Sequence, residues 1–185
     1  DIATGLPWVG TLKAPVGALT ITPITNLAQS LIEKGLATNV EKAENLIFSS
    51  FPELPRFDLS VYDPTLFALN GTDTQKAESV AIQSVTAQIV NILSTGAALL
   101  EGAGVTSEAA QSAVLQSLIS KVGAAQPLDL TKAEEIGAVF QSAVSIASSD
   151  AEVVGKVGEL LTSVTSIVSE VNTRAQVAAE AFIDG

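Results

Sequence analysis

The sequence contains no histidine and no cysteine, so its 20 Asp and Glu carboxylates are the main side chains that could act in catalysis or bind a metal. The absence of both excludes catalytic triads built on His or Cys, disulfide bonds and thiolate metal sites. The serines form neither a Gly-x-Ser-x-Gly turn nor a Ser-x-x-Lys pair, which are arrangements that activate a serine nucleophile. The sequence therefore predicts a protein that is not an enzyme.

The carboxylates that are close in sequence are Glu41 with Glu44, Glu134 with Glu135, and Asp58 with Asp63. The glutamates occupy the opening turns of expected helices, where acidic side chains favour the positive end of the helix dipole. Asp58 and Asp63 lie in an expected loop, and two interpretations stay open. They could bind calcium together with backbone carbonyls, although no Asp-x-Asp-x-Asp-Gly spacing supports this, or Asp63 could cap a short helix. No other cofactor is expected.

Composition narrows the range of partners. Twenty acidic residues against nine basic ones give a net charge of -11, which repels phosphate backbones and anionic membrane surfaces, so nucleic acid is not an expected partner. Hydrophobic residues make up 47% of the chain and charged residues only 16%. Helices of this composition must bury much of their surface. We expect a homo-oligomer, or contacts with neighbouring domains of the same protein.

The element that must position everything else is an uncharged stretch from Ser79 to Leu100, which predicts a long central helix. Its apolar face steps by three and four through Ile82, Val85, Ile89, Ile92, Gly96 and Leu99. A stretch of this length could also cross a bilayer. Gln83, Gln88 and Asn91 lie within it, however, and no aromatic belt or basic cluster flanks it. We therefore expect a helix buried in protein and no membrane span.

Helix-capping signals extend this pattern over residues 22–185 and predict an all-α fold, a multi-helix bundle of about five or six helices. Thr22-Pro23 opens the first helix, and capping boxes begin at Thr38, Thr72 and Thr131. The last helix starts at Ser149 and carries a heptad seam through Val153, Val157, Leu160, Val164, Ile167, Val171 and Ala175. Beside this seam lies a second apolar stripe of Val154, Leu161 and Val168, which either the bundle or a neighbouring molecule must cover.

Two segments are not expected to be mainly helical. Residues 51–70 contain Pro52 and Pro55 and are rich in aromatic side chains, so we expect a loop that wraps the bundle, with one short helix after Asp63. Residues 1–21 have a density of Gly and Pro that no helix tolerates, which predicts an extended N-terminal arm. The chain starts with Asp1 and has no Met, so we expect that it was processed or belongs to a longer protein.

The candidate interaction residues are the apolar side chains of this arm, Ile2, Leu6, Trp8, Val9 and Leu12. Burial of Trp8 and Leu12 alone is worth roughly 3 to 6 kcal/mol by area. The arm could fold over its own bundle, pair with a preceding domain or dock on a neighbouring subunit. Docking outside its own bundle is the interpretation we favour, because the Gly and Pro residues give the arm reach.

Several short runs carry a resemblance to a known family. Asp1-Ile-Ala-Thr4-Gly5-x-Pro7, Gly10-Thr-Leu12-x-Ala14-Pro15-x-Gly17 and Thr22-Pro23-Ile-Thr25-x-Leu27 resemble the TG-x-P, G-x-L-x-AP-x-G and TPLTTL run of large type I secreted, RTX or adhesin-like bacterial surface proteins. Phe57-Asp58 and Tyr62-Asp63-Pro64 resemble the pattern that follows in that family. The chain departs from it at Ile24 and Asn26, and it lacks the family's calcium-binding nonapeptides.

This resemblance implies an extracellular, cell-surface location and a scaffold or adhesion role, and it supplies no catalytic residues. We predict a non-catalytic structural or adhesion-type module of a secreted bacterial surface protein that self-assembles through its N-terminal arm. The alternative is a helical binding module, with a groove along Val154, Leu161 and Val168 for an apolar ligand or a partner helix.

Overall fold

The computed structural model describes residues 11–59 and 61–184, and helices are the regular secondary structure of this part of the chain. The fold is all-α, as predicted, with seven described helices instead of five or six. They are α1 (Pro23–Glu33), α2 (Val40–Ser50), α3 (Pro64–Asn70), α4 (Asp73–Gly102), α5 (Ser107–Gly123), α6 (Ala133–Ala147) and α7 (Ala151–Asp184).

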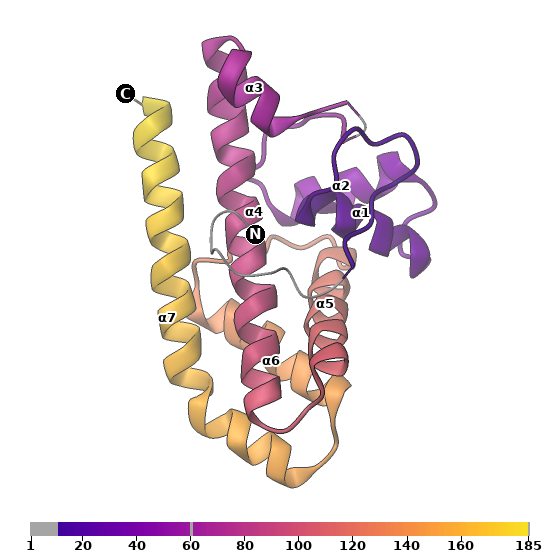
Figure 1. Cartoon of the computed structure of the whole chain (residues 1–185), viewed down its shortest axis with the longest axis vertical. Coiled ribbons are helices and arrows are strands. Elements are labelled where there is room, and N and C mark those ends of the chain that lie inside the picture. The colour runs from indigo at the N-terminus through magenta and orange to yellow at the C-terminus, as the bar shows by residue number, and fades with distance from the viewer. Residues whose placement is uncertain (1–10, 60, 185) are drawn as a thin grey trace.

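Helices α4 to α7 form a four-helix bundle (Figure 1). Each helix packs against the next along the chain, and α7 closes the ring by packing along α4. The connections between them are short, which places successive helices antiparallel. Helices α4 and α7 have 30 and 34 residues, whereas α5 and α6 have 17 and 15. The C-terminal half of α7 therefore extends past α6 and packs on α4 (Figure 1).

Helix α4 is the central element that the sequence predicts. All six residues of its expected apolar face are buried, from Ile82 to Leu99. The predicted capping box also forms, because the Thr72 hydroxyl accepts from the Gln75 N–H and the Gln75 side chain accepts from the Thr72 N–H. Gly96 lies where α4 approaches α5 and α6 closely: a Cβ atom there would be 2.7 Å from Phe140 Cε1 and 3.0 Å from Val114 Cγ1.

Helix α3 packs on the N-terminal end of α4, α1 contacts α2, α4 and α5, and α2 packs on α1 and α5 (Figure 1). Helix α1 opens as predicted, with Thr22 as its cap and Pro23 as its first residue. It buries Ile24, Leu27 and Leu31 against α2, α4 and α5. One core therefore runs through the described part of the chain, from α1 to α7.

The buried face of α7 differs from the predicted heptad seam. Val157 is buried, but Leu160, Ile167 and Val171 are 53%, 62% and 46% exposed. The helix is rotated so that its inner face runs through Val157, Leu161, Thr165, Val168, Asn172 and Ala179. Val168 is therefore in the core and Leu161 packs against it, so the predicted open groove along Val154, Leu161 and Val168 is wrong for those two residues.

Three helix starts also differ from the predicted caps. Asn39, not Thr38, caps α2, with its Oδ1 accepting from the Lys42 N–H at 2.9 Å. Lys132 precedes α6 and makes no side-chain capping bond there. At the start of α7 the Asp150 carboxylate accepts from the Glu152 N–H at 2.8 Å, in place of the predicted Ser149. In the first and third cases a short Asx side chain takes the role expected of a neighbouring hydroxyl.

Among the described helices, none combines the length and the hydropathy needed to cross a membrane.

Candidate functional site

Three of the carboxylates named from the sequence, Asp63, Glu44 and Glu135, accept backbone hydrogen bonds, and Glu41 and Glu134 lie in the first turns of α2 and α6. Asp63 caps α3, because its Oδ1 accepts from the N–H groups of Thr65 and Leu66 at 2.9 and 3.0 Å. This is the capping role that stood beside calcium binding as an interpretation. Within residues 11–59 and 61–184, no group of three or more acidic residues is placed to hold a metal ion.

Glu44 and Glu135 each hold a loop to a helix. The Glu44 carboxylate accepts from the backbone N–H of Leu59 at 2.8 Å, and Glu135 accepts from the N–H of Asp129 at 2.6 Å. Burial raises the pKa of Glu44 above its ordinary value of 4.5, and the hydrogen bond from Leu59 opposes this in part. These side chains therefore fix loops on the bundle surface, and each acts on a different loop.

Asp129 lies in the connection between α5 and α6 and forms a compact hydrogen-bonded turn just before α6. Its carboxylate accepts from the Thr131 N–H at 2.9 Å and the Thr131 hydroxyl at 2.5 Å, and it lies 3.3 Å from the Lys132 ammonium. Burial raises the pKa of Asp129, but the Thr131 and Lys132 contacts outweigh it and bring the pKa below 3.8. The ionised form of Asp129 is thus favoured in the folded protein.

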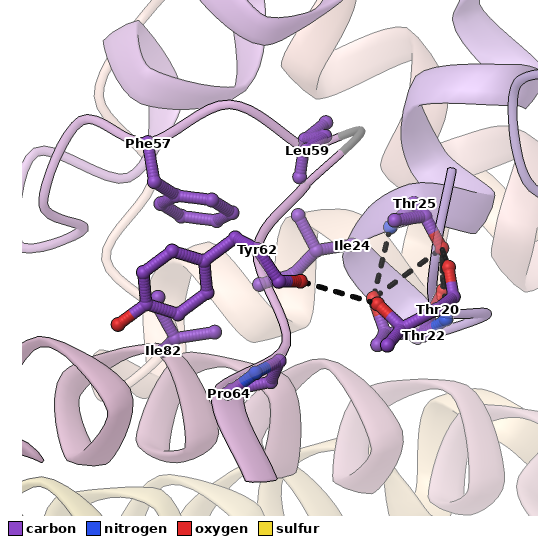
Figure 2. Close-up of a pocket in the computed structure, with 9 residues that line it drawn as sticks. All are labelled: Thr20, Thr22, Ile24, Thr25, Phe57, Leu59, Tyr62, Pro64 and Ile82. Carbon is purple, nitrogen blue, oxygen red and sulfur yellow. Dashed lines mark hydrogen bonds between the residues drawn. The ribbon is translucent and has the colours of Figure 1, made fainter. Parts of the chain in front are cut away.

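The loop between α2 and α3 is held by a chain of aromatic rings, as the sequence predicts. Phe48, Phe57, Tyr62 and Phe67 follow one another with ring centroids 5.4, 4.9 and 4.8 Å apart. The Tyr62 hydroxyl lies 3.1 Å from the Ser79 hydroxyl of α4. Figure 2 shows the hollow beneath this loop, between the start of α1 and Ile82, with a volume of about 10 Å³. That is at most the space of one water molecule.

The described part of the arm lies on its own bundle. The Lys13 backbone N–H donates to Asn26 Oδ1 at 2.9 Å, and the Lys13 ammonium lies 2.8 Å from Glu33 Oε2. This contact lowers the pKa of Glu33 below 4.5. Thr20 then donates to the Tyr62 carbonyl at 3.3 Å (Figure 2). Between these two contacts Val16 is fully exposed, at 103%. Residues 13–20 therefore form a short arch that is attached to the bundle at Lys13 and at Thr20.

Of the five arm residues predicted to interact, only Leu12 falls within the described part, where it is half-buried. Ile2, Leu6, Trp8 and Val9 lie outside the described residues. A hollow of about 140 Å³ lies where the described chain begins, between Thr11, Lys13, α1 and α5. Ligand pockets usually measure 300 Å³ or more, so this hollow suits a side chain better than a small molecule.

The described surface of α7 carries an apolar stripe, which we call the α7 stripe. Its members are exposed, uncharged residues on one side of the helix: Leu160, Ile167, Val171, Ala178 and Phe182. Because an α-helix turns by about 100° per residue, these five lie within roughly 60° of one another. Val153 and Val164 lie on the same side of the helix and are half-buried.

Charged residues border the α7 stripe along one edge. Lys156 forms an ion pair with Glu152 at 2.7 Å, and Arg174 forms one with Glu170. Lys156 and Arg174 are five helical turns apart and so share the same edge. Between the two ion pairs the same edge carries Ser163 and the exposed Glu159. One ion pair therefore lies just before Leu160, and the other lies beside Val171.

A buried polar network explains why α7 is rotated away from its predicted seam. Asn172 has no exposed surface, donates to the Leu130 carbonyl at 2.7 Å and accepts from Asn91 of α4 at 2.9 Å. One turn earlier, the Ser169 hydroxyl donates to the Thr131 carbonyl. These bonds fasten α7 both to α4 and to the connection before α6. They require Asn172 to face inward, which turns Ile167 and Val171 toward solvent.

No protein-family model, curated protein or solved structure matches this chain at a significant level.

Proposed function

We propose that this chain is a non-catalytic structural or adhesion-type module of a secreted bacterial surface protein, and that it acts through contacts with other protein surfaces. The α7 stripe is the observation that carries the interaction role. Exposed Leu, Ile, Val and Phe side chains on one helix face are costly in water, since each buried CH₂ is worth about 0.8 kcal/mol. A surface of this kind is usual where another protein binds.

The extracellular part of the proposal rests on the sequence runs of the arm and the first helix. In the structure, the described residues of these runs shape the path of the chain into α1. Pro15 is buried, Gly17 turns the chain with a φ of 95°, and Thr22, Pro23 and Thr25 start α1. The run thus encodes an arm that leads into a helix and lies back on it. This is compatible with a module that follows another domain in a larger surface protein.

The test of location uses intact cells of the source organism. An antibody raised against the full chain should label intact cells or the secreted fraction, and external protease should remove the label from cells. A signal that appears only after lysis, and that protease cannot reach before lysis, would contradict the surface role. A cytoplasmic protein serves as the control for cell integrity.

The test of the arm uses single substitutions in the full chain. If the arm docks on a neighbouring copy or domain, Trp8→Asp should abolish assembly and leave the melting temperature unchanged, because Trp8 would then pack on that neighbour and not on its own bundle. Val16→Asp is the matched control, since Val16 is an apolar arm residue that is fully exposed. A large drop in melting temperature for Trp8→Asp in a chain that is monomeric throughout would show that the arm covers its own bundle.

A further inference from the structure

We infer that Asn70 is a site of N-linked glycosylation, at which a sugar is attached to the nitrogen of the side-chain amide. The inference rests on the proposed extracellular location, because N-linked sugars are carried on the surface of secreted chains. Asn70 is followed by Gly71 and Thr72, and Asn-x-Ser/Thr is the sequence in which an asparagine accepts a sugar. None of the other five asparagines of the chain is followed by this pattern.

Asn70 is also the asparagine whose side chain has no structural contact in the described part of the chain. It is exposed, and no hydrogen bond joins its amide to the described residues. The amides of the other five asparagines all form side-chain hydrogen bonds: Asn26 with Lys13, Asn39 with Lys42, Asn45 with Arg56, and Asn91 and Asn172 with each other. The amide that the sequence marks as a sugar acceptor is therefore the one that an enzyme can reach without breaking a contact.

The backbone at Asn70 leaves the helix and becomes extended. Asn70 is the last residue of α3, Gly71 has φ −76° and ψ 171°, and Thr72 has φ −64° and ψ 166°. An enzyme can therefore approach the amide of Asn70 and the hydroxyl of Thr72 without unwinding α3 or α4. Helix α3 lies at one end of the elongated molecule, where a bulky group has room to extend into solvent (Figure 1).

Two exposed leucines lie beside Asn70. Leu66 and Leu69 are 52% and 74% exposed, and α3 has no buried residue. Leu66 precedes Asn70 by four residues, so the two side chains are neighbours on one face of the helix. A sugar is bulky and solubilising, and on Asn70 it would shield this apolar end of α3 from other molecules.

The transfer forms one bond and breaks another. The Asn70 Nδ2 atom bonds to C1 of a sugar that is carried on a diphosphate, and the bond between C1 and the diphosphate oxygen breaks. The diphosphate leaves with the electron pair, and the amide nitrogen gives up one proton to a base of the transferase. No oxidant or reductant is needed. This chain supplies only the acceptor, whereas the transferase and the glycosyl diphosphate belong to the cell that produces it.

The experiment produces the full chain and three variants in the source organism and maps their peptides by mass spectrometry. In the original chain, Asn70 should be heavier by one or more sugar residues. Thr72→Ser should keep this added mass, because it keeps the acceptor pattern. Asn70→Gln should lose it, because the acceptor residue is gone.

The third variant, Thr72→Asp, separates glycosylation from folding. Thr72 caps α4 by accepting from the Gln75 N–H at 3.3 Å, and an aspartate can accept the same bond. This variant should therefore fold with an unchanged melting temperature but lose the added mass, because it no longer has the acceptor pattern. Addition of single sugars would indicate a nucleotide-linked donor, whereas transfer of a complete oligosaccharide would indicate a lipid-linked donor.

Three outcomes would overturn the inference. The first is an unmodified Asn70 in chain recovered from the cell surface or the medium, which would leave the proposed location intact. The second is added sugar that persists in Asn70→Gln, since another residue would then be the acceptor. The third is conversion of Asn70 to an aspartate by loss of ammonia, with no sugar attached. A sugar on Asn70 of chain that is found only inside cells would instead contradict the proposed location and support the inference.

Discussion

The close approach of α4 to its neighbours at Gly96 makes a quantitative prediction. An alanine Cβ at this position would lie 2.7 Å from Phe140 Cε1 and 3.0 Å from Val114 Cγ1, where 3.4 to 4 Å is an ordinary contact. Phe140 and Val114 are 1% and 0% exposed, so neither side chain has free space to move into. Overpacking of this kind costs typically 1 to 3 kcal/mol. Replacing a mid-helix glycine with alanine returns about 0.5 to 1 kcal/mol through backbone entropy.

We therefore expect Gly96→Ala to destabilise the protein by about 1 to 2 kcal/mol and to lower the melting temperature by roughly 2 to 8 °C. Gly158→Ala is the control, because Gly158 also lies within a helix but a Cβ there would contact nothing within 4 Å. It should stabilise the protein by about 0.5 to 1 kcal/mol. Calorimetry and urea unfolding of both variants measure the two signs.

A double-mutant cycle identifies the contact that is responsible. Phe140→Leu removes the ring atoms nearest to the new methyl group but leaves a cavity, so it is destabilising by itself. Combined with Gly96→Ala it should cost less than the sum of the two single effects, because the alanine methyl partly fills that cavity. The reasoning is refuted if Gly96→Ala stabilises the protein as Gly158→Ala does, or if its effect simply adds to that of Phe140→Leu.

Two further predictions concern the contacts that hold α7 and the connection before α6. Asn172→Ala should lower the free energy of unfolding, measured in urea, by about 2 to 4 kcal/mol, because it leaves the Leu130 carbonyl and the Asn91 amide without their partner. Asn91 is only half-buried, so a larger decrease for Asn91→Ala than for Asn172→Ala would contradict this. Because the pKa of Asp129 is lower in the folded protein than its ordinary 3.8, its ionised form adds stability that is present above pH 3.8 and is lost as pH falls through the folded value. Urea unfolding from neutral pH to about pH 3 measures the difference in free energy of unfolding between the original protein and Asp129→Asn. This difference should be largest at neutral pH and should shrink on acidification, and a difference that grows on acidification would contradict the reasoning.

Much of the fold could be predicted because its signals are local. The apolar face of α4 follows from three- and four-residue spacing, and its six predicted residues, from Ile82 to Leu99, are all buried. The caps at Thr22 and Thr72 form because each hydroxyl needs only the backbone N–H three residues later. The aromatic loop was also predictable, because several aromatic rings close together in sequence bury their apolar surface by packing on each other and on the bundle.

The candidate site was less predictable, because the surface that a helix leaves exposed depends on what its neighbours offer. The pattern of α7 contains two apolar stripes, and hydrophobicity alone favours the more regular one as the inner face. Asn172 reverses this choice: its amide bonds to Leu130 and Asn91, which are 42 and 81 residues distant in sequence. Hydrophobic periodicity assigns a polar residue such as Asn172 to the exposed face of a helix. Asn172 is nevertheless fully buried, because its hydrogen-bond partners lie inside the bundle.

What the sequence by itself determined was therefore the helical class, the central helix and the helix starts at Thr22, Asp63 and Thr72. These depend on spacing within one segment and on composition. Only the tertiary structure decided which face of α7 is exposed, that Glu44 fastens the aromatic loop through Leu59, and that Gly96 lies against Phe140. Each of these depends on the distance between atoms that are far apart along the chain, and such distances are set by the packing of all the helices together.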